Sequence, residues 1–408
     1  MDADKLKHVL FIGGHDGTFN HYDGLPFRFT CIQREASLGP NLKQLTDRIH
    51  MVDELTMENV IAKSREIHES DPVDYIMSFT EDGLLPSATA AATLGVPGID
   101  LNACRLCIDK SLMRDHLRNT RFSLPFKLCR DFSEARDFLI SNHEAVIFKP
   151  LNGAGSAGVF IAYDEQELRE KTADLNLLEA PLLAETYLDG RMFSVETLTI
   201  RGHHEVVAIT AVELEEGTFV PIQHILPAPS YPDVDQRAIR DFCLGLLDCI
   251  KYKHGPCHIE IKVRGEKISL IEINNRVGGD LLGHLAHQTQ GVNMFRETIQ
   301  YLFEGVPDVD HRASEKRFAF GSSRSFRYPV EVSLLHEALV KMNIALFNLD
   351  PDSETPTEFK SAEDRLGPIV FTSNSEREFN DALASIKGLV QSSAPAARDR
   401  EALLPVGA

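Results

Sequence analysis

The first hundred residues alternate short apolar runs with stretches of helical periodicity. Residues 8–14, HVLFIGG, and 74–79, DYIMSF, are compact apolar runs typical of buried strands. An alanine-rich helix follows the second run and is stopped by Gly95 and Pro97. Strands that alternate with helices predict a parallel α/β sheet, which we place in an N-terminal domain of residues 1–105.

From residue 106 to about residue 306 the pattern favours antiparallel strands. One amphipathic helix is predicted at 107–119, followed by a strand at 144–150 and by two strands on either side of Asp189-Gly190. The clearest signal is a hairpin with its turn at 264–267, in which polar and apolar positions alternate with a period of two. The polar positions are His258, Glu260 and Lys262, and the apolar ones are Ile259, Ile261 and Val263.

The last third of the chain begins with helices at 281–290, ended by Gly291, and at 293–304, ended by Gly305. Residues 307–390 then contain two strand-like runs, 341–349 and 367–373, and one helix at 376–390. This pattern predicts a C-terminal α+β subdomain. The tail, 391–408, is small and polar, and we expect it to be disordered.

Composition and charge narrow the class of protein. A chain of 408 residues exceeds one hydrophobic core, and its net charge of -19 argues against nucleic acid or an anionic membrane as partner. The sequence lacks an apolar run of about 18 residues, and its N-terminal apolar segment lacks a signal-peptide cleavage site. Together with seven scattered cysteines, typical of reduced thiols, these features predict a cytoplasmic protein.

Cys104 and Cys107 form a CxxC pair that has no second pair and no clustered histidine beside it. A zinc or redox site needs such partners, so two buried cysteines on one apolar helix face are the favoured interpretation.

A glycine-rich loop, 152–159, directly follows Lys149 at the end of a predicted strand. Backbone N–H groups in such a loop can surround an anion, and the lysine would add a positive charge beside the same phosphates. The alternative is a plain hairpin tip, since no P-loop Gly-Lys-Ser/Thr follows.

The hairpin predicts a cation site. Glu260 and Glu272 face each other across it, about 5 Å apart, and Asn274 lies two residues further on the same face. Two carboxylates and an amide oxygen are ligands suited to Mg²⁺, whereas zinc would require Cys or His, and we expect neither to be close enough. Arg276 follows and can hold a carboxylate or phosphoryl group bidentately. The alternative is a solvated hairpin face with a surface salt bridge.

Six segments occur in the order found in ATP-grasp enzymes, and the chain resembles this family over roughly residues 100–305. They are DKSLMRDHL, VIFKP, GAGSAGV, AETYLDGRMFSVE, HIEI and LIEINNRVGGD. The N-terminal strands resemble the α/β domain that precedes the family's catalytic domain. Residues 359–383 resemble the C-terminal piece of the L-amino-acid ligase branch, which joins free amino acids.

The resemblance implies a role for each motif. Lys110 and Lys149 would contact the ATP phosphates, and the glycine loop would be the flap of a lid spanning about 145–187. The implied ATP-binding residues are Lys110, Lys149, Gly153, Gly155, Ser156, Gly158 and the hinge Glu185, Thr186, Tyr187 and Leu188, whose backbone would bind the adenine edge. The implied ligands of Mg²⁺, with Mn²⁺ as an alternative, are Glu260, Glu272 and Asn274.

The resemblance further implies that Arg276 and the backbone N–H groups of Gly278 and Gly279 stabilise an oxyanion. Four residues are implied on the substrate side: Glu81, His224, Asp280 and His284. The alternative to a substrate role is a helix cap for Asp280 and a surface position for His284.

Two positions depart from the family pattern. Met192 stands where many relatives have a glutamate for the ribose hydroxyls, which leaves Asp189 as one candidate for that contact. Pro221 stands where an acidic residue is expected before His224, which bears on the recognition of a free α-amino group.

These observations predict an ATP-dependent carboxylate–amine ligase that joins amino acids or related small acids through an acyl phosphate, releasing ADP and phosphate. ATP, a small carboxylic acid and an amine would be its partners, and a homodimer is implied by the resemblance alone. One alternative is an ATP-grasp ligase or carboxylase component with another acceptor, of purine-pathway or biotin-carboxylase type. The other is a non-enzymatic nucleotide-binding regulator, which the intact residue set at 260–276 argues against.

Overall fold

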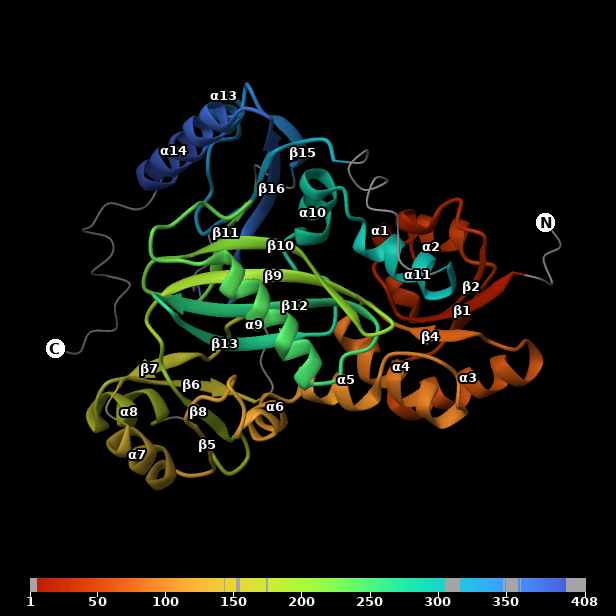
Figure 1. The fold of residues 1–408 in the computed structure, drawn as a ribbon, viewed down its shortest axis with the longest axis horizontal. Helices are drawn as coiled ribbons and strands as arrows, with labels where there is room; N and C mark the ends of the chain where they lie inside the picture. The colour runs from red at the N-terminus through yellow and green to blue at the C-terminus, as the bar shows by residue number, and fades with distance from the viewer. Residues whose placement is uncertain are drawn as a thin grey trace.

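The computed structural model describes residues 6–142, 144–151, 155–173, 175–304, 316–347, 349, 359 and 361–393. The predicted ATP-binding residue Gly153 and residues 394–408 of the predicted tail lie outside the described residues. The described residues form two four-stranded sheets and one eight-stranded sheet, which Figure 1 shows as three separate layers. No helix among them is long and apolar enough to cross a membrane.

The N-terminal sheet is parallel, as predicted, and its strand order is β3-β2-β1-β4. Its strands are β1 Lys7–Ile12, β2 Phe27–Gln33, β3 Arg48–Met51 and β4 Tyr75–Met77. The longer helices α3 Met57–Ser70 and α4 Glu81–Leu94 pack on one face, and α4 ends at Gly95 in a left-handed conformation. The short elements are α1 Asp16–Phe19, η2 Asn20–Tyr22, η3 Glu35–Ser37 and α2 Pro40–Leu45.

The predicted helix at 107–119 is two helices, which corrects the sequence interpretation. α5 covers Leu101–Ile108 and α6 covers Lys110–Leu117. The carboxylate of Asp109 accepts the N–H groups of Ser111 and Leu112 at 2.8 and 3.0 Å, so it caps a new helix instead of continuing the old one. Cys104 and Cys107 are buried on α5, as expected from the apolar helix face.

The second four-stranded sheet, which we call the lid sheet, is antiparallel with order β5-β8-β6-β7. Its elements are β5 Phe126–Cys129, β6 Val146–Pro150, β7 Phe160–Ala162 and β8 Leu182–Thr186, with helices α7 Phe132–Ser141 and α8 Glu165–Thr172. The helices pack on one face, around a core that includes Phe148 and Leu168. The other face is turned toward the largest sheet (Figure 1).

The eight-stranded sheet has the order β13-β12-β9-β10-β11-β14-β16-β15, with antiparallel neighbours throughout. The central strands are β9 Arg191–Ile200, β10 His203–Leu214, β11 Pro221–Leu226, β12 Gly255–Arg264 and β13 Lys267–Asn274. The C-terminal ones are β14 Phe320–Phe326, β15 Asn343–Phe347 and β16 Leu366–Ser373. The helices are α9 Gln236–Cys249, α10 Leu282–Gln290, α11 Met294–Glu304, α13 Val332–Ala338 and α14 Glu376–Ser393.

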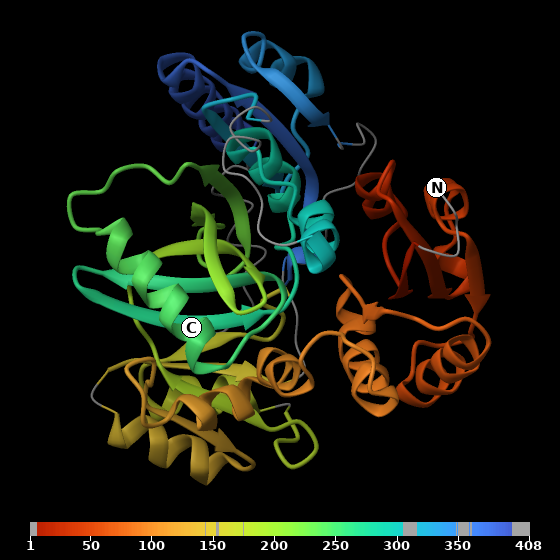
Figure 2. The ribbon, with the colours of Figure 1, turned by 45° about the vertical axis from the view of Figure 1, so that its right-hand side comes forward.

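The predicted hairpin is confirmed. β12 and β13 pair so that Glu260 lies opposite Glu272, and His258 lies opposite Asn274. Within residues 307–390, β14 and α13 were not predicted, and the serine-rich run at 320–326 has no strong apolar alternation. Elements earlier in the chain were not predicted either, among them β2, α3, α7, α8 and α9. β14 to β16 extend the central sheet and share its core, so the predicted C-terminal subdomain has no sheet of its own. Figure 2 shows these blue strands running beside α10.

A buried ion triad joins the lid sheet to the large sheet. Arg114, on α6, is 1% exposed and its Nε lies 2.5 Å from Glu185 Oε1 on β8. The other carboxylate oxygen of Glu185 accepts a hydrogen bond from Lys149 Nζ at 2.7 Å. Arg114 Nη2 also donates to the backbone oxygens of Leu270 and Ile271 on β13, at 2.8 and 3.0 Å. The triad therefore fixes the lid sheet relative to the hairpin.

We predict that Arg114→Leu lowers the free energy of unfolding by about 3–5 kcal/mol, because it leaves a buried carboxylate with only one of its two cations. Urea denaturation would measure the change. The matched control is Arg105→Leu on the exposed side of α5, which should change stability by less than about 0.5 kcal/mol. Equal effects of the two substitutions would contradict a central role for the triad.

Candidate active site

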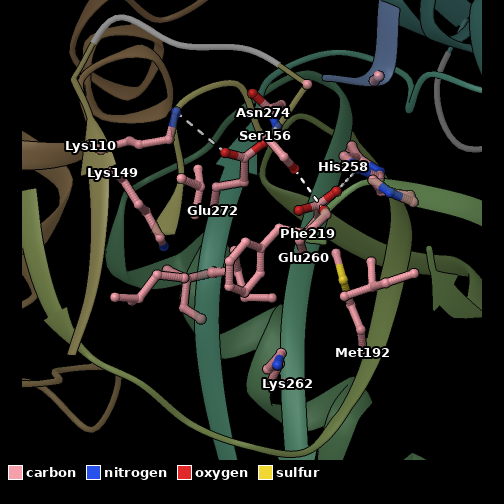
Figure 3. A pocket seen from close by; sticks show the side chains of 18 of the residues that line it. Lys110, Lys149, Ser156, Met192, Phe219, His258, Glu260, Lys262, Glu272 and Asn274 are labelled. Atoms are coloured by element: carbon pink, nitrogen blue, oxygen red, sulfur yellow. Dashed lines mark hydrogen bonds and ion pairs between the residues drawn. The ribbon is translucent and has the colours of Figure 1, made fainter. Parts of the chain in front are cut away.

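A cavity of about 280 Å³ lies between the lid sheet and the hairpin face of the large sheet (Figure 3). The predicted site residues that line it come from distant parts of the chain. They are Lys110, Lys149, Gly155, Ser156, Glu185, Thr186, Tyr187, Leu188, His224, Glu260, Glu272, Asn274, Arg276, Gly279 and Asp280. Four described candidates lie outside the lining: Glu81, Gly158, Gly278 and His284.

The acidic side of the cavity is formed by Glu260, Glu272 and Asn274 on the hairpin. Asn274 Nδ2 donates to Glu272 Oε1 at 2.9 Å, and Lys110 Nζ lies 3.4 Å from Glu272 Oε2. Burial alone would raise the pKa of Glu272, but the nearby Lys110 and Asn274 lower it, so the carboxylate is ionised. Among the described residues no three Asp, Glu, His or Cys side chains converge as a metal cage. The donor set fits Mg²⁺ that takes its remaining oxygens from water and phosphate.

A histidine lies at this site, contrary to the expectation that none would be close. His258 Nε2 is 3.3 Å from Glu260 Oε1, and its Nδ1 is 2.5 Å from Glu196 Oε1 on the neighbouring strand β9. Burial alone would lower the pKa of His258, but Glu196 and Glu260 raise it to about 10. The ring is therefore an imidazolium that holds Glu260 in place, not a neutral metal ligand.

The N–H of Gly278 does not face the cavity. It donates to Glu196 Oε2 at 3.0 Å, which corrects the expectation that it serves an oxyanion. A Cβ at Gly278 would stand 2.7 Å from both Glu196 Oε1 and His258 Nδ1, so only glycine fits above this ion pair. Gly279, in contrast, lines the cavity.

Lys149 and the hinge form the lid side of the cavity. Burial would raise the pKa of Glu185, but Arg114 and Lys149 lower it to about 2, and the paired lysine is directed along the lid wall. The N–H groups of Thr186 and Tyr187 donate to Pro125 O at 3.1 Å and Ala145 O at 2.8 Å. Because these two N–H groups are already hydrogen-bonded within the protein, neither is free to bind the adenine base.

The described part of the glycine loop contacts two distant segments. Gly155 O accepts the N–H of Ala362 at 2.9 Å, and Ser156 Oγ donates to Phe219 O at 2.8 Å. Gly155 has a φ of +61°, a left-handed conformation that favours glycine. The loop is therefore held over the cavity by backbone acceptors and donors from β10–β11 and from the C-terminal segment.

Asp280 belongs to a second charged group and does not cap α10. Its carboxylate accepts from Arg365 Nη2 at 2.6 Å, Arg365 Nη1 at 2.8 Å and His224 Nε2 at 2.9 Å. Burial would raise the pKa of Asp280, but His224 and Arg365 hold it well below its usual range. Arg365 was not predicted, because it arrives from the C-terminal segment over a long sequence distance.

Arg276 lines the cavity, and its guanidinium pairs with Glu81 at the start of α4, with Nε 3.1 Å from Glu81 Oε1. The two implied residues are thus in contact, although Glu81 itself is outside the lining. His284 is in a different place. It lies on α10 near His287 and Arg317, which together with burial lower its pKa.

Two further side chains complete the far end of the cavity. Met192 lines it, and so does Lys262, whose Nζ donates to Tyr187 Oη at 2.8 Å. Asp189, the alternative ribose contact, is exposed and does not line the cavity. The period-two pattern already placed Lys262 on the face of Glu260, but no role was assigned to it.

Comparisons with known proteins identify the domain. A profile of the ATP-grasp domain matches residues 142–284. The chain is 20% identical over 374 residues to the L-arginine-specific L-amino acid ligase of Bacillus subtilis, covering 85% of this chain and 87% of that one. The L-amino acid ligase structure from Bacillus licheniformis matches with a TM-score of 0.73 at 19% identity, covering 94% and 97% of the two chains. Carboxyaminoimidazole ribonucleotide synthase from Aspergillus clavatus complexed with ATP matches with a TM-score of 0.74 at 14% identity, covering 96% and 100%.

We predict a pH dependence of stability from the Glu196–His258 pair in the metal-free protein. Because the pKa of His258 is raised from 6.5 to about 10 on folding, its contribution is fully present below pH 6.5 and is lost as the pH rises through about 10. Urea denaturation between pH 6 and 10, with chelator present, should show this loss. Glu196→Gln should flatten that part of the profile, whereas Glu216→Gln, at an exposed position, should leave it unchanged.

Proposed function

We propose that this chain, which contains an ATP-grasp domain at residues 142–284, is an ATP-dependent ligase that joins a small carboxylic acid to an amine, with amino acids as the preferred substrate class. One observation carries the proposal: Lys149 from the lid sheet, Lys110 from α6 and two carboxylates from the hairpin line one cavity. In such an arrangement the lysines can neutralise the β- and γ-phosphates of a nucleotide, and the carboxylates can hold the metal ion that binds the same phosphates.

The chemistry assigned to the chain begins with the phosphates. Glu260, Glu272 and Asn274 would hold Mg²⁺, which supplies neutralising charge when bound. Lys110 and Lys149 contact the phosphate oxygens, and the residues of the site keep the donor and acceptor in line. A carboxylate oxygen of the substrate then attacks the γ-phosphorus, the bond to the β-phosphate oxygen breaks, and an acyl phosphate and ADP result.

The second step is assigned to Arg276 and Gly279. The amine attacks the acyl carbon, and the developing oxyanion is stabilised by the guanidinium and by the Gly279 N–H before phosphate leaves. Glu81 pairs with Arg276 in this structure, so the substrate acid would compete for the same guanidinium. The loop at 155–158 lies above the cavity and would exclude water, which would otherwise hydrolyse the acyl phosphate.

Amino acids are proposed as substrates because two of the similar proteins are L-amino acid ligases, and because of the wall formed by Asp280, His224 and Arg365. An amino acid is a small zwitterion with one ammonium and one carboxylate. The carboxylate of this wall could pair with the ammonium, and its two cationic or polar groups could pair with the carboxylate. The second candidate is a carboxylase-like enzyme, because the same fold is shared with a carboxyaminoimidazole ribonucleotide synthase.

The deciding experiment is phosphate release from ATP across a panel of amino acids and small acids, supplied singly and in pairs, with bicarbonate as a separate arm. Release that requires two named partners, with an amide product seen by mass spectrometry, supports the ligase. Release that requires bicarbonate supports the second candidate. Nucleotide binding without release for any pair would reject both enzymes.

We predict that Glu272→Gln lowers turnover by about 100-fold or more, because the metal site loses one of its two carboxylates while the shape is kept. Phosphate release and thermal unfolding should be measured together, and the unfolding midpoint should stay close to that of the parent. The matched control is Glu266→Gln in the exposed turn of the same hairpin, which should retain turnover. Full activity of Glu272→Gln would show that the metal assignment is wrong.

A further inference from the structure

Lys262 is a buried cation that the proposed chemistry does not use. It is 8% exposed and lines the cavity. One N–H of its ammonium donates to Tyr187 Oη at 2.8 Å, and the group lies 4.4 Å from the centroid of the same ring. Among the described residues it has no ion-pair partner and no other hydrogen-bond acceptor.

The Lys262 ammonium is expected to bind a further hydrogen-bond acceptor. An ammonium carries three N–H donors, and leaving two of them unpaired in a buried position is unfavourable. The residues paired with Lys262 on the two neighbouring strands are Met192 on β9 and Ser269 on β13. Ser269 also lines the cavity, and its hydroxyl makes no hydrogen bond with Lys262 in this structure. Figure 3 shows the Lys262 nitrogen at the end of the cavity remote from Lys110 and Glu272. The two remaining donors are thus available to water or to a ligand that enters the cavity at this end.

The position along β12 indicates which part of the nucleotide that is. His258, Glu260 and Lys262 alternate on one face, so Lys262 lies about 7 Å beyond Glu260 along the strand. If the β- and γ-phosphates lie beside Glu260 and Glu272, the α-phosphate follows in this direction and the sugar comes after it. The base would pack against apolar lining residues such as Leu188 and Ile147.

We propose that Lys262 and Tyr187 together bind the ribose of the nucleotide, with the ammonium donating to a sugar hydroxyl oxygen. The proposal rests on the proposed function, because it takes the phosphate end of the cavity from it. Tyr187 accepts one N–H of Lys262, so its own hydroxyl hydrogen is directed elsewhere and can serve the second sugar oxygen. A cation and a phenol, with no carboxylate, thus recognise the sugar in this chain.

The test is direct nucleotide binding by calorimetry, with ADP, 2′-deoxyADP and 3′-deoxyADP as probes in the presence of Mg²⁺. The parent should bind ADP more tightly than at least one deoxy analogue. Lys262→Met should weaken ADP binding about tenfold and bring the three affinities close together, because a charge-assisted hydrogen bond to the sugar is lost. Methionine has a similar length and removes a buried charge, so the fold should be retained.

Two further variants sharpen the result. Lys267→Met makes the same chemical change at the exposed start of β13, outside the cavity, and should bind all three nucleotides like the parent. Tyr187→Phe removes the hydroxyl that holds the ammonium and should reduce the discrimination between ADP and the deoxy analogues. Both variants should unfold at temperatures close to that of the parent.

The outcomes separate this inference from the proposed function. An equal loss for all three nucleotides in Lys262→Met would place the lysine on a phosphate or on the base and overturn the ribose assignment. Unchanged binding would overturn it as well, and so would a parent that binds no nucleotide, which also rejects the proposed function. Loss of discrimination in a protein that forms no amide would support the ribose site while rejecting the ligase.

Discussion

The carboxylate of Glu185, buried between Arg114 and Lys149, is the contact on which the arrangement of the site depends. Two cations on opposite sides keep it ionised in a place where burial alone would favour the neutral acid. Lys149 thereby has a fixed position on the lid wall, and Arg114 reaches the backbone of β13, on which Glu272 lies. One ion triad thus determines the separation between the two sides of the cavity.

Positive and negative side chains lie on different sides of the cavity, an arrangement that the individual sequence motifs do not reveal. Lys149 on the lid sheet and Lys110 on α6 contribute cations, and the hairpin contributes carboxylates. Beside them lies a second, buried ion pair between Glu196 on β9 and His258 on β12. Glu196 also accepts the N–H of Gly278, so the turn after β13 and the orientation of Glu260 share one anchor. Glu196 on the neighbouring strand β9 therefore holds the polar end of β13 in place, while the side chains of that end line the cavity.

The sequence was informative where structure is local. The hairpin, its register and the parallel N-terminal sheet followed from periodicity and turn residues, because those signals arise within a few residues. The Asp109 cap was visible but was overlooked in an otherwise regular pattern. The Glu196–His258 pair and the arrival of Arg365 at Asp280 were out of reach, because each depends on pairing between segments far apart in the chain. Lys262 was placed on the correct face, yet its significance appeared only once Tyr187 and the cavity were known.

The continuity of the large sheet has a consequence for how this protein can be dissected. β11 pairs with β14 from Gln223 to Leu226, and β14 in turn pairs with β16. A fragment ending near residue 284, where the match to the family domain ends, would leave β11 as an open strand edge with unpaired backbone groups, a surface prone to intermolecular pairing. It would also lack Arg365, and with it the counter-ion of Asp280. The folded unit around the cavity is thus larger than the segment that matches the ATP-grasp profile, and excision or fusion designs have to include the C-terminal strands.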